Sequence, residues 1–181
     1  MLTHCTRLDL SGCGLEGPLP PQLSLMRALK HLCLADNGFS GPLLAQLVDC
    51  ARLETVDLSG NQLGGELPAA WGRLNALRVL RLARNRRLVG SLPDAWAELA
   101  NLHELDVAHN NFTGPVPAAV FSLLQPSGAQ RRGRSSSRGG GSAGGGGDGS
   151  GAGATAKLKI VRLRGNDWDA TIPRWPQVCL C

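Results

Sequence analysis

A motif that returns every 24 residues constrains the fold of this chain more than any other feature of its sequence. Each copy follows L-x-x-L-x-L-x-x-N-x-L-x-G-x-L-P, and the clearest copy covers residues 53–76. The copies open at Cys5, Leu29, Leu53, Leu77 and, after 25 residues instead of 24, at Leu102. A sequence with this period folds into a stack of similar units, because one unit cannot bury its own apolar face.

The repeats divide the chain into three parts. Five units cover residues 5–125, and the pattern resumes at Leu158 after an interruption of 32 residues at 126–157. A sixth unit and a degenerate C-terminal cap cover residues 158–181. The chain starts inside the first unit, so we expect either that upstream sequence is missing or that the first unit frays, and we favour a truncated product.

Each column of the repeat has a physical role. The L-x-L core predicts a short strand whose alternate side chains point inward. The asparagine column (Cys13, Asn37, Asn61, Asn85, Asn110) satisfies backbone groups in the turn, with Cys13 expected as a small buried substitute. The glycine column (Gly17, Gly41, Gly65, Gly90, Gly114) permits a turn that a side chain would obstruct. Two later apolar columns, which include Trp71 and Trp96, pack the convex side.

These aligned copies resemble the leucine-rich repeat family, in its plant-type subclass with the L-x-G-x-[IVL]-P signature. Similar units occur in receptor-like proteins, receptor kinase ectodomains and trypanosomatid surface antigens. The resemblance implies an α/β solenoid: a right-handed arc with a short parallel sheet on its concave face and irregular or 3-10 turns on its convex face. It also implies a non-catalytic module that binds a protein, peptide or glycan ligand through the concave face.

The interruption at 126–157 differs in composition from the repeats. It holds 12 of the 24 glycines, no aromatic residue and four arginines. Such a segment buries too little apolar surface to offset its ordering entropy, so we expect a disordered Gly/Ser/Arg-rich insert. Contacts to nucleic acid or to an acidic partner through Arg131, Arg132 and Arg134 would make the chain an intracellular scaffold, which is the alternative function. We favour a solvated linker, because no aromatic residue accompanies the arginines.

The cysteines and one sequon point to different compartments. Cys13 and Cys50 fall in columns expected to be buried, and Cys33 is expected to face outward on the concave sheet, so we interpret the cysteines as free thiols. Asn111 begins the sequon Asn-Phe-Thr, which predicts glycosylation. The chain shows no signal peptide and no apolar run long enough to span a membrane. Family resemblance favours the cell surface, the thiols are compatible with the cytoplasm, and localisation stays open.

The outward row of the concave face carries most of the charge that a ligand would meet. Asp57, Arg81 and Asp106 should be lateral neighbours and pair with one another, because adjacent strands lie ~4.8 Å apart. Arginines cluster around them, which suggests a basic patch for an acidic protein or a glycan. The candidate ligand-binding residues are Arg78, Arg81, Arg84, His103, Asp106 and Arg162.

The sequence offers no catalytic constellation. His103 and His109 do not follow the H-E-x-x-H spacing and lie on a strand and a turn instead of a helix. We therefore expect no enzyme, no cofactor and no metal site, and the oligomeric state stays open.

Overall fold

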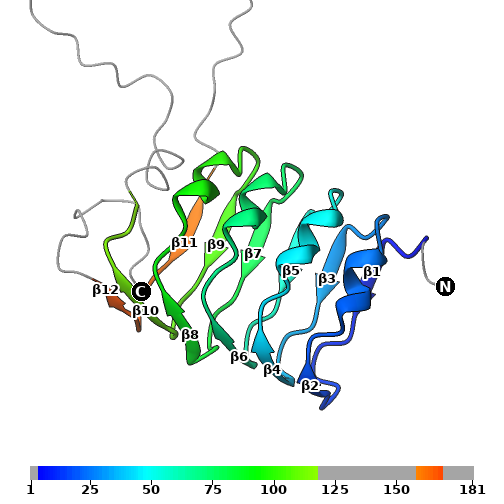
Figure 1. Ribbon diagram of the computed structural model, residues 1–181, viewed down its shortest axis with the longest axis horizontal. Coiled ribbons are helices and arrows are strands. Elements are labelled where there is room, and N and C mark those ends of the chain that lie inside the picture. The colour runs from blue at the N-terminus through cyan, green and yellow to red at the C-terminus, as the bar shows by residue number, and fades with distance from the viewer. Residues whose placement is uncertain (1–3, 118–157, 169–181) are drawn as a thin grey trace, which may run out of the picture.

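The computed structural model describes residues 4–117 and 158–168, and it shows a solenoid of stacked units (Figure 1). One strand from each unit joins a parallel sheet in the order β1-β3-β5-β7-β9-β11. These strands are β1 (Arg7–Asp9), β3 (His31–Cys33), β5 (Thr55–Asp57), β7 (Val79–Arg81), β9 (Glu104–Asp106) and β11 (Ile160–Arg162). The chain is thus a leucine-rich solenoid with parallel strands, as the repeat predicts. Strand β11, which follows the interruption, pairs directly with β9.

A second parallel sheet, which the analysis of the repeat columns missed, runs along the side of the solenoid that is lowest in Figure 1. Its strands are β2 (Glu16–Pro18), β4 (Gly38–Pro42), β6 (Gln62–Gly65), β8 (Arg87–Gly90), β10 (Asn111–Gly114) and β12 (Asp167–Trp168). The glycine column lies inside these strands with φ from 78° to 90°, where L side chains are strained. Gly65, Gly90 and Gly114 end their strands, whereas Gly17 and Gly41 lie one residue before the end, so each glycine turns the chain at or next to the end of a short strand.

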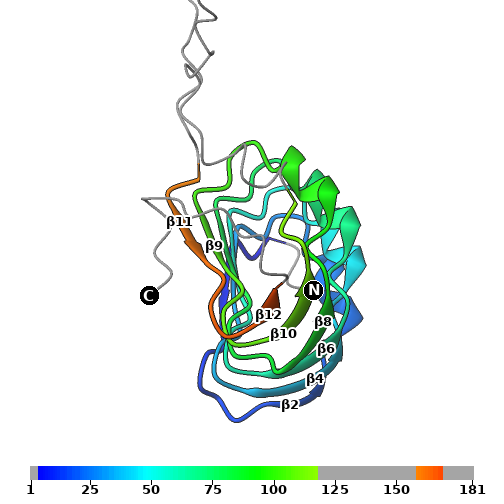
Figure 2. The ribbon, with the colours of Figure 1, turned by 90° about the vertical axis from the view of Figure 1, so that its left-hand side faces the viewer.

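The side opposite the first sheet consists of 3-10 turns, which Figure 2 shows stacked across from β9 and β11. They are η1 (Pro21–Leu25), η2 (Ala45–Asp49), η3 (Ala69–Arg73) and η4 (Asp94–Glu98). No α-helix occurs among residues 4–117 and 158–168, and the 3-10 turns confirm what the repeat resemblance implied for the convex face. Trp71 and Trp96 stack between η3 and η4 with ring centroids 6.3 Å apart, and their indole N–H groups donate to the carbonyls of Leu44 and Pro68.

The core is one continuous column of leucines between the sheets and the turns. Leu58, Leu80 and Leu82 are fully buried, and so is Cys50, as predicted. The asparagine column forms a ladder between units: Asn85 donates to the carbonyls of Leu58 and Leu82 and accepts from the N–H of Leu63. Three backbone groups that the turns leave unpaired are satisfied by this one side chain.

Cys13 contradicts its predicted burial. It is exposed, and its thiol contacts only the carbonyl of Ser11 in its own unit. Leu10 and Leu15 of the same unit are 37% and 36% exposed, although the leucines in these columns of the middle units are buried. The first unit packs against one neighbour, so the columns of the first unit are buried on one side only.

Several sequence-based expectations lie beyond the described residues: the insert at 126–157, the cap at 169–181, and the cysteines Cys179 and Cys181. Cys5, Cys13, Cys33 and Cys50 are free thiols. Cys33 lies half-buried on the outer row of the first sheet, as predicted, and burial raises the pKa of its thiol. Within the described residues no helix has both the length and the apolar character that crossing a membrane requires.

Candidate functional site

The outward row of the first sheet brings together residues that are far apart in the sequence. The strand register places Asp57 beside Arg81 and Arg81 beside Asp106, which confirms that the three are lateral neighbours. The predicted pairing holds for Arg81 with Asp57. Among the described residues Asp106 pairs with Arg162 and not with Arg81. Arg162 from β11 follows beside Asp106. The row exists because the residue between the two core leucines of each unit must point away from the core.

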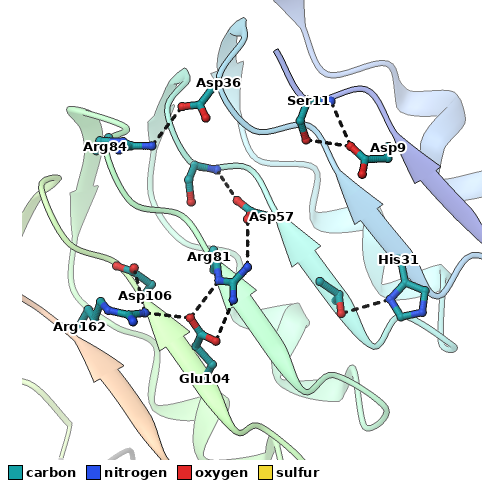
Figure 3. Close-up of polar contacts among 12 residues, drawn as sticks. Asp9, Ser11, His31, Asp36, Asp57, Arg81, Arg84, Glu104, Asp106 and Arg162 are labelled. Atoms are coloured by element: carbon teal, nitrogen blue, oxygen red, sulfur yellow. Dashed lines mark hydrogen bonds and ion pairs between the residues drawn. The ribbon is translucent and has the colours of Figure 1, made fainter. Parts of the chain in front are cut away.

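A carboxylate that the sequence analysis did not single out organises this row. Glu104 accepts from Arg81 through two parallel hydrogen bonds, each 2.9 Å long, and from Nη1 of Arg162 at 2.8 Å (Figure 3). Arg81 also lies 3.5 Å from Asp57, and Arg162 lies 3.5 Å from Asp106. We call these five residues the Glu104 network. It joins four neighbouring units, and a bidentate arginine–carboxylate contact fixes its orientation.

The environment of Glu104 favours its ionised form. Its residue exposure is 9%, and the hydrogen bonds from Arg81 outweigh the effect of burial, so the pKa of the carboxyl is lowered. The same contact raises the pKa of the Arg81 guanidinium. Glu104 occupies a column that holds Thr55, Val79 and Ile160 in neighbouring units. The sequence signal that could have identified Glu104 was a single acidic residue between uncharged neighbours in its column, placed diagonally from Arg81 and Arg162.

The other predicted site residues lie around the network. Arg84 pairs with Asp36 at 3.1 Å, across the intervening unit, and Arg78 lies 3.9 Å from Glu54. His103 lies before β9 and contacts the carbonyl of Asn101. All four arginines among the candidate ligand-binding residues therefore have carboxylate partners, and this part of the surface carries both signs of charge. The binding role of these residues stays a prediction. Surface pairs of this kind contribute little individually.

A shallow hollow of about 330 Å³ opens on this face at the carboxyl ends of the strands. Its lining combines both signs of charge: Asp36, Asp57, Arg81, Arg84, Asp106, His109, Arg162 and Arg164, with Ala35, Ser59, Ala83 and Ala108 between them. Arg164 has no ion pair among the residues described. Small residues leave the charged tips accessible, so the hollow can form hydrogen bonds with an extended segment of mixed charge.

Two further predictions concern residues outside this hollow. Asn111 lies on β10 in the second sheet and is exposed, and its side chain makes no hydrogen bond to the residues that the structure describes. Its glycosylation stays a prediction. His103 precedes β9 and His109 follows it, so the two rings are not brought together. In the part of the chain that the structure describes, no three His, Cys, Asp or Glu side chains form a group that could hold a metal.

The repeat geometry agrees with comparisons to known families. A leucine-rich repeat model matches residues 52–112, and a second leucine-rich repeat model matches residues 4–26. Each complete described unit contributes one strand to each parallel sheet and one 3-10 turn. The chain is a leucine-rich repeat protein. More particularly, it resembles the ectodomains of plant leucine-rich repeat receptor-like proteins and receptor kinases.

Three relatives from Arabidopsis thaliana illustrate the resemblance. Receptor-like protein 1 is 33% identical over 120 residues, which is 64% of this chain and 11% of that protein. The ectodomain of the receptor kinase GASSHO1/SCHENGEN3, solved in complex with CASPARIAN STRIP INTEGRITY FACTOR 2, superposes with a TM-score of 0.65 at 29% identity, covering 86% of this chain and 15% of that one. A chain of the BIR3–SERK2 complex gives a TM-score of 0.60 at 36% identity, covering 62% of this chain and 60% of that one.

The matched region is a small part of the curated relatives. The chain spans only 6–11% of their length. The receptor kinases among them match in their repeats alone. The likeness is therefore to non-catalytic ectodomains.

Proposed function

We propose that this chain is a non-catalytic binding module that holds an extended segment of a protein or peptide across its concave face. The Glu104 network carries this proposal. It fixes two arginines and three carboxylates on the outward side of a sheet whose inward side is fully buried. A ligand therefore meets polar groups that are already oriented, which lowers the ordering cost of binding.

The dimensions of the face support an extended ligand. The hollow collects residues from five neighbouring units, from Asp36 to Arg164. Five strands at ~4.8 Å spacing give a lining about 20 Å across, which an extended segment of about six residues would cross. The lining offers Arg164 and the exposed Arg84–Asp36 pair as groups that can exchange partners.

The relatives support the same class of ligand. The GASSHO1/SCHENGEN3 ectodomain was solved with a bound factor, and the BIR3–SERK2 structure is a complex between two proteins. By the same resemblance we place the proposed module on the outer side of the cell. Recovery of the native protein from the cytosolic fraction alone would contradict that placement.

Selection of short linear peptides from a displayed library on the full chain tests the proposal. Peptides selected on the wild type should lose about tenfold or more in affinity when Arg84 and Arg164 are both changed to Glu, because two cations of the hollow become repulsive. Arg52→Glu is the matched control, since Arg52 is exposed and lies outside the hollow. Equal binding to wild type and double variant, or a library that yields no binder, would overturn the proposal.

A further inference from the structure

The turn after β7 contains the one residue that exceeds the 24-residue spacing between Leu77 and Leu102. In the second and third units, the N–H two residues beyond the asparagine donates to the asparagine of the following unit, as Phe39 does to Asn61 and Leu63 to Asn85. In the fourth unit it is the backbone N–H of Asn85 that donates to the side-chain oxygen of Asn110, at 2.7 Å. The N–H of Leu88 donates to the carbonyl of Asn85 at 2.9 Å. The extra residue is accommodated in a tight turn, and this turn holds Arg86 in solvent.

Two neighbouring side chains project beside this turn from strained backbone. Arg84 and His109 have φ of 59° and 57°, whereas the equivalent positions in the units on either side are Gly60 and Gly165 at 68° and 69°. A non-glycine residue in this region costs about 1–2 kcal/mol. A Cβ added to Gly165 would lie 2.5 Å from Nδ1 of His109, so the histidine ring lies over that glycine. A side chain at position 165 would therefore clash with the imidazole ring of His109.

Together these residues line a second hollow of about 450 Å³, formed by Arg84, Arg86, His109, Asn110, Asn111 and Gly165. None of its described lining residues is a carboxylate, in contrast to the concave hollow with its three aspartates. Among the described residues Arg86 has no ion pair and the amide of Asn111 has no hydrogen bond. Arg84 uses only Nη2 for Asp36, and its other N–H groups have no partner within the described part of the chain.

We propose that this second hollow binds a tetrahedral oxyanion, either free sulfate or phosphate or the same group carried as a monoester on a larger ligand. Two guanidinium groups present forked donors that match such an anion. The His109 ring and the Asn111 amide supply further donors from the equivalent turn of the next unit. Arg84 and His109 line both hollows, so a bound oxyanion lies at the border of the concave face. The site is nevertheless distinct from the proposed peptide surface, because Arg86 and Asn111 line only this hollow.

The test uses the full chain made in bacteria, since a glycan on Asn111 would cover the hollow. Sodium sulfate and a monosaccharide sulfate ester are titrated while NaCl keeps the ionic strength constant, and amide chemical shifts are followed by NMR. We expect saturable shifts near Arg86, His109 and Gly165. Arg86→Gln should weaken binding about tenfold or more, the effect of losing a charge-assisted contact.

Arg27→Gln is the matched control, because Arg27 is exposed and lies far from the hollow in the first unit. Thermal melting of both variants verifies that they are folded. Tighter binding of the ester assigns the site to a ligand-borne group, and tighter binding of the inorganic ion assigns it to the free anion; both support the proposal. Shifts that do not saturate, or an equal loss of binding in Arg86→Gln and Arg27→Gln, would overturn it.

Discussion

The first and fourth units follow the same repeat but use their matching residues differently. Leu82 of the fourth unit is fully buried, whereas Leu10 in the same column of the first unit is 37% exposed. On the outward row, Arg81 contacts carboxylates from the units on both sides, whereas the partners of Asp9 among the described residues, Arg7 and Ser11, lie in its own unit. A repeat column therefore predicts where a side chain points. The number of neighbouring units determines how deeply it is buried and which groups it meets.

The asparagine column should show the largest difference between the two units. Asn85→Ala removes the partner of three backbone groups, and we expect a loss of about 4 kcal/mol in unfolding free energy, at 1–3 kcal/mol for each buried group left unpaired. Cys13→Ala should change it by less than about 0.5 kcal/mol, since the thiol is exposed. Urea denaturation followed by circular dichroism measures both. Similar losses would show that the ladder does not depend on burial.

The leucine column should show a somewhat smaller contrast. Leu82→Ala leaves a cavity in a closely packed column, and we expect a loss of about 3 kcal/mol. Leu10→Ala should cost less than about 1 kcal/mol, because water already reaches that side chain. Urea midpoints compared at constant slope give the difference. A Leu10 variant as damaging as the Leu82 variant would mean that the first unit is covered in solution.

The outward row should show the smallest effect on stability and a distinct dependence on pH. Glu104→Gln should cost about 1–2 kcal/mol at neutral pH, because two half-exposed arginines lose an anionic partner. Since the pKa of Glu104 is lowered in the folded chain, its contribution is complete above the unfolded value of about 4.3 and is lost as the pH falls through the folded value.

Stability measured between neutral pH and pH ~3 tests this sign. The difference between wild type and Glu104→Gln should shrink on acidification. Asp9→Asn is the control from the first unit, and its effect should be smaller than that of Glu104→Gln because Asp9 is bound only within its own unit. A difference that grows at low pH would contradict the assigned ionisation of Glu104.

The fold was predictable from sequence because its determinants recur. Leucines at fixed spacing identify the strands, and the glycine column identifies the positive φ angles. The second sheet was missed because its strands are short and contain the glycines and prolines that usually indicate a turn. Trp168 illustrates what the pattern did contain: it shares a column with Phe112, and the two rings stack 5.8 Å apart.

The candidate site was less predictable, since its chemistry does not recur. The row of Asp57, Arg81 and Asp106 followed from alternation along each strand. The partner Glu104 did not, because its contact with Arg162 depends on how two side chains cross between neighbouring strands on either side of a 32-residue interruption. The basic turn at Arg86 arises from a single extra residue, whose conformation a repeat pattern cannot specify.

The asparagine ladder has a direction. Asn37 of the second unit bonds the carbonyl of Leu10 and the N–H of Leu15 in the first, and Asn166 of the sixth unit does the same for Val107 and Phe112 in the fifth. Each unit is therefore completed by the unit that follows it. Local unfolding of the sixth unit leaves backbone groups of the fifth unit without their side-chain partner. Local unfolding of the first unit instead releases one side-chain amide, that of Asn37, which water can solvate. Unravelling of the solenoid should thus start more readily at its amino end, and amide exchange should slow from the first unit toward the middle.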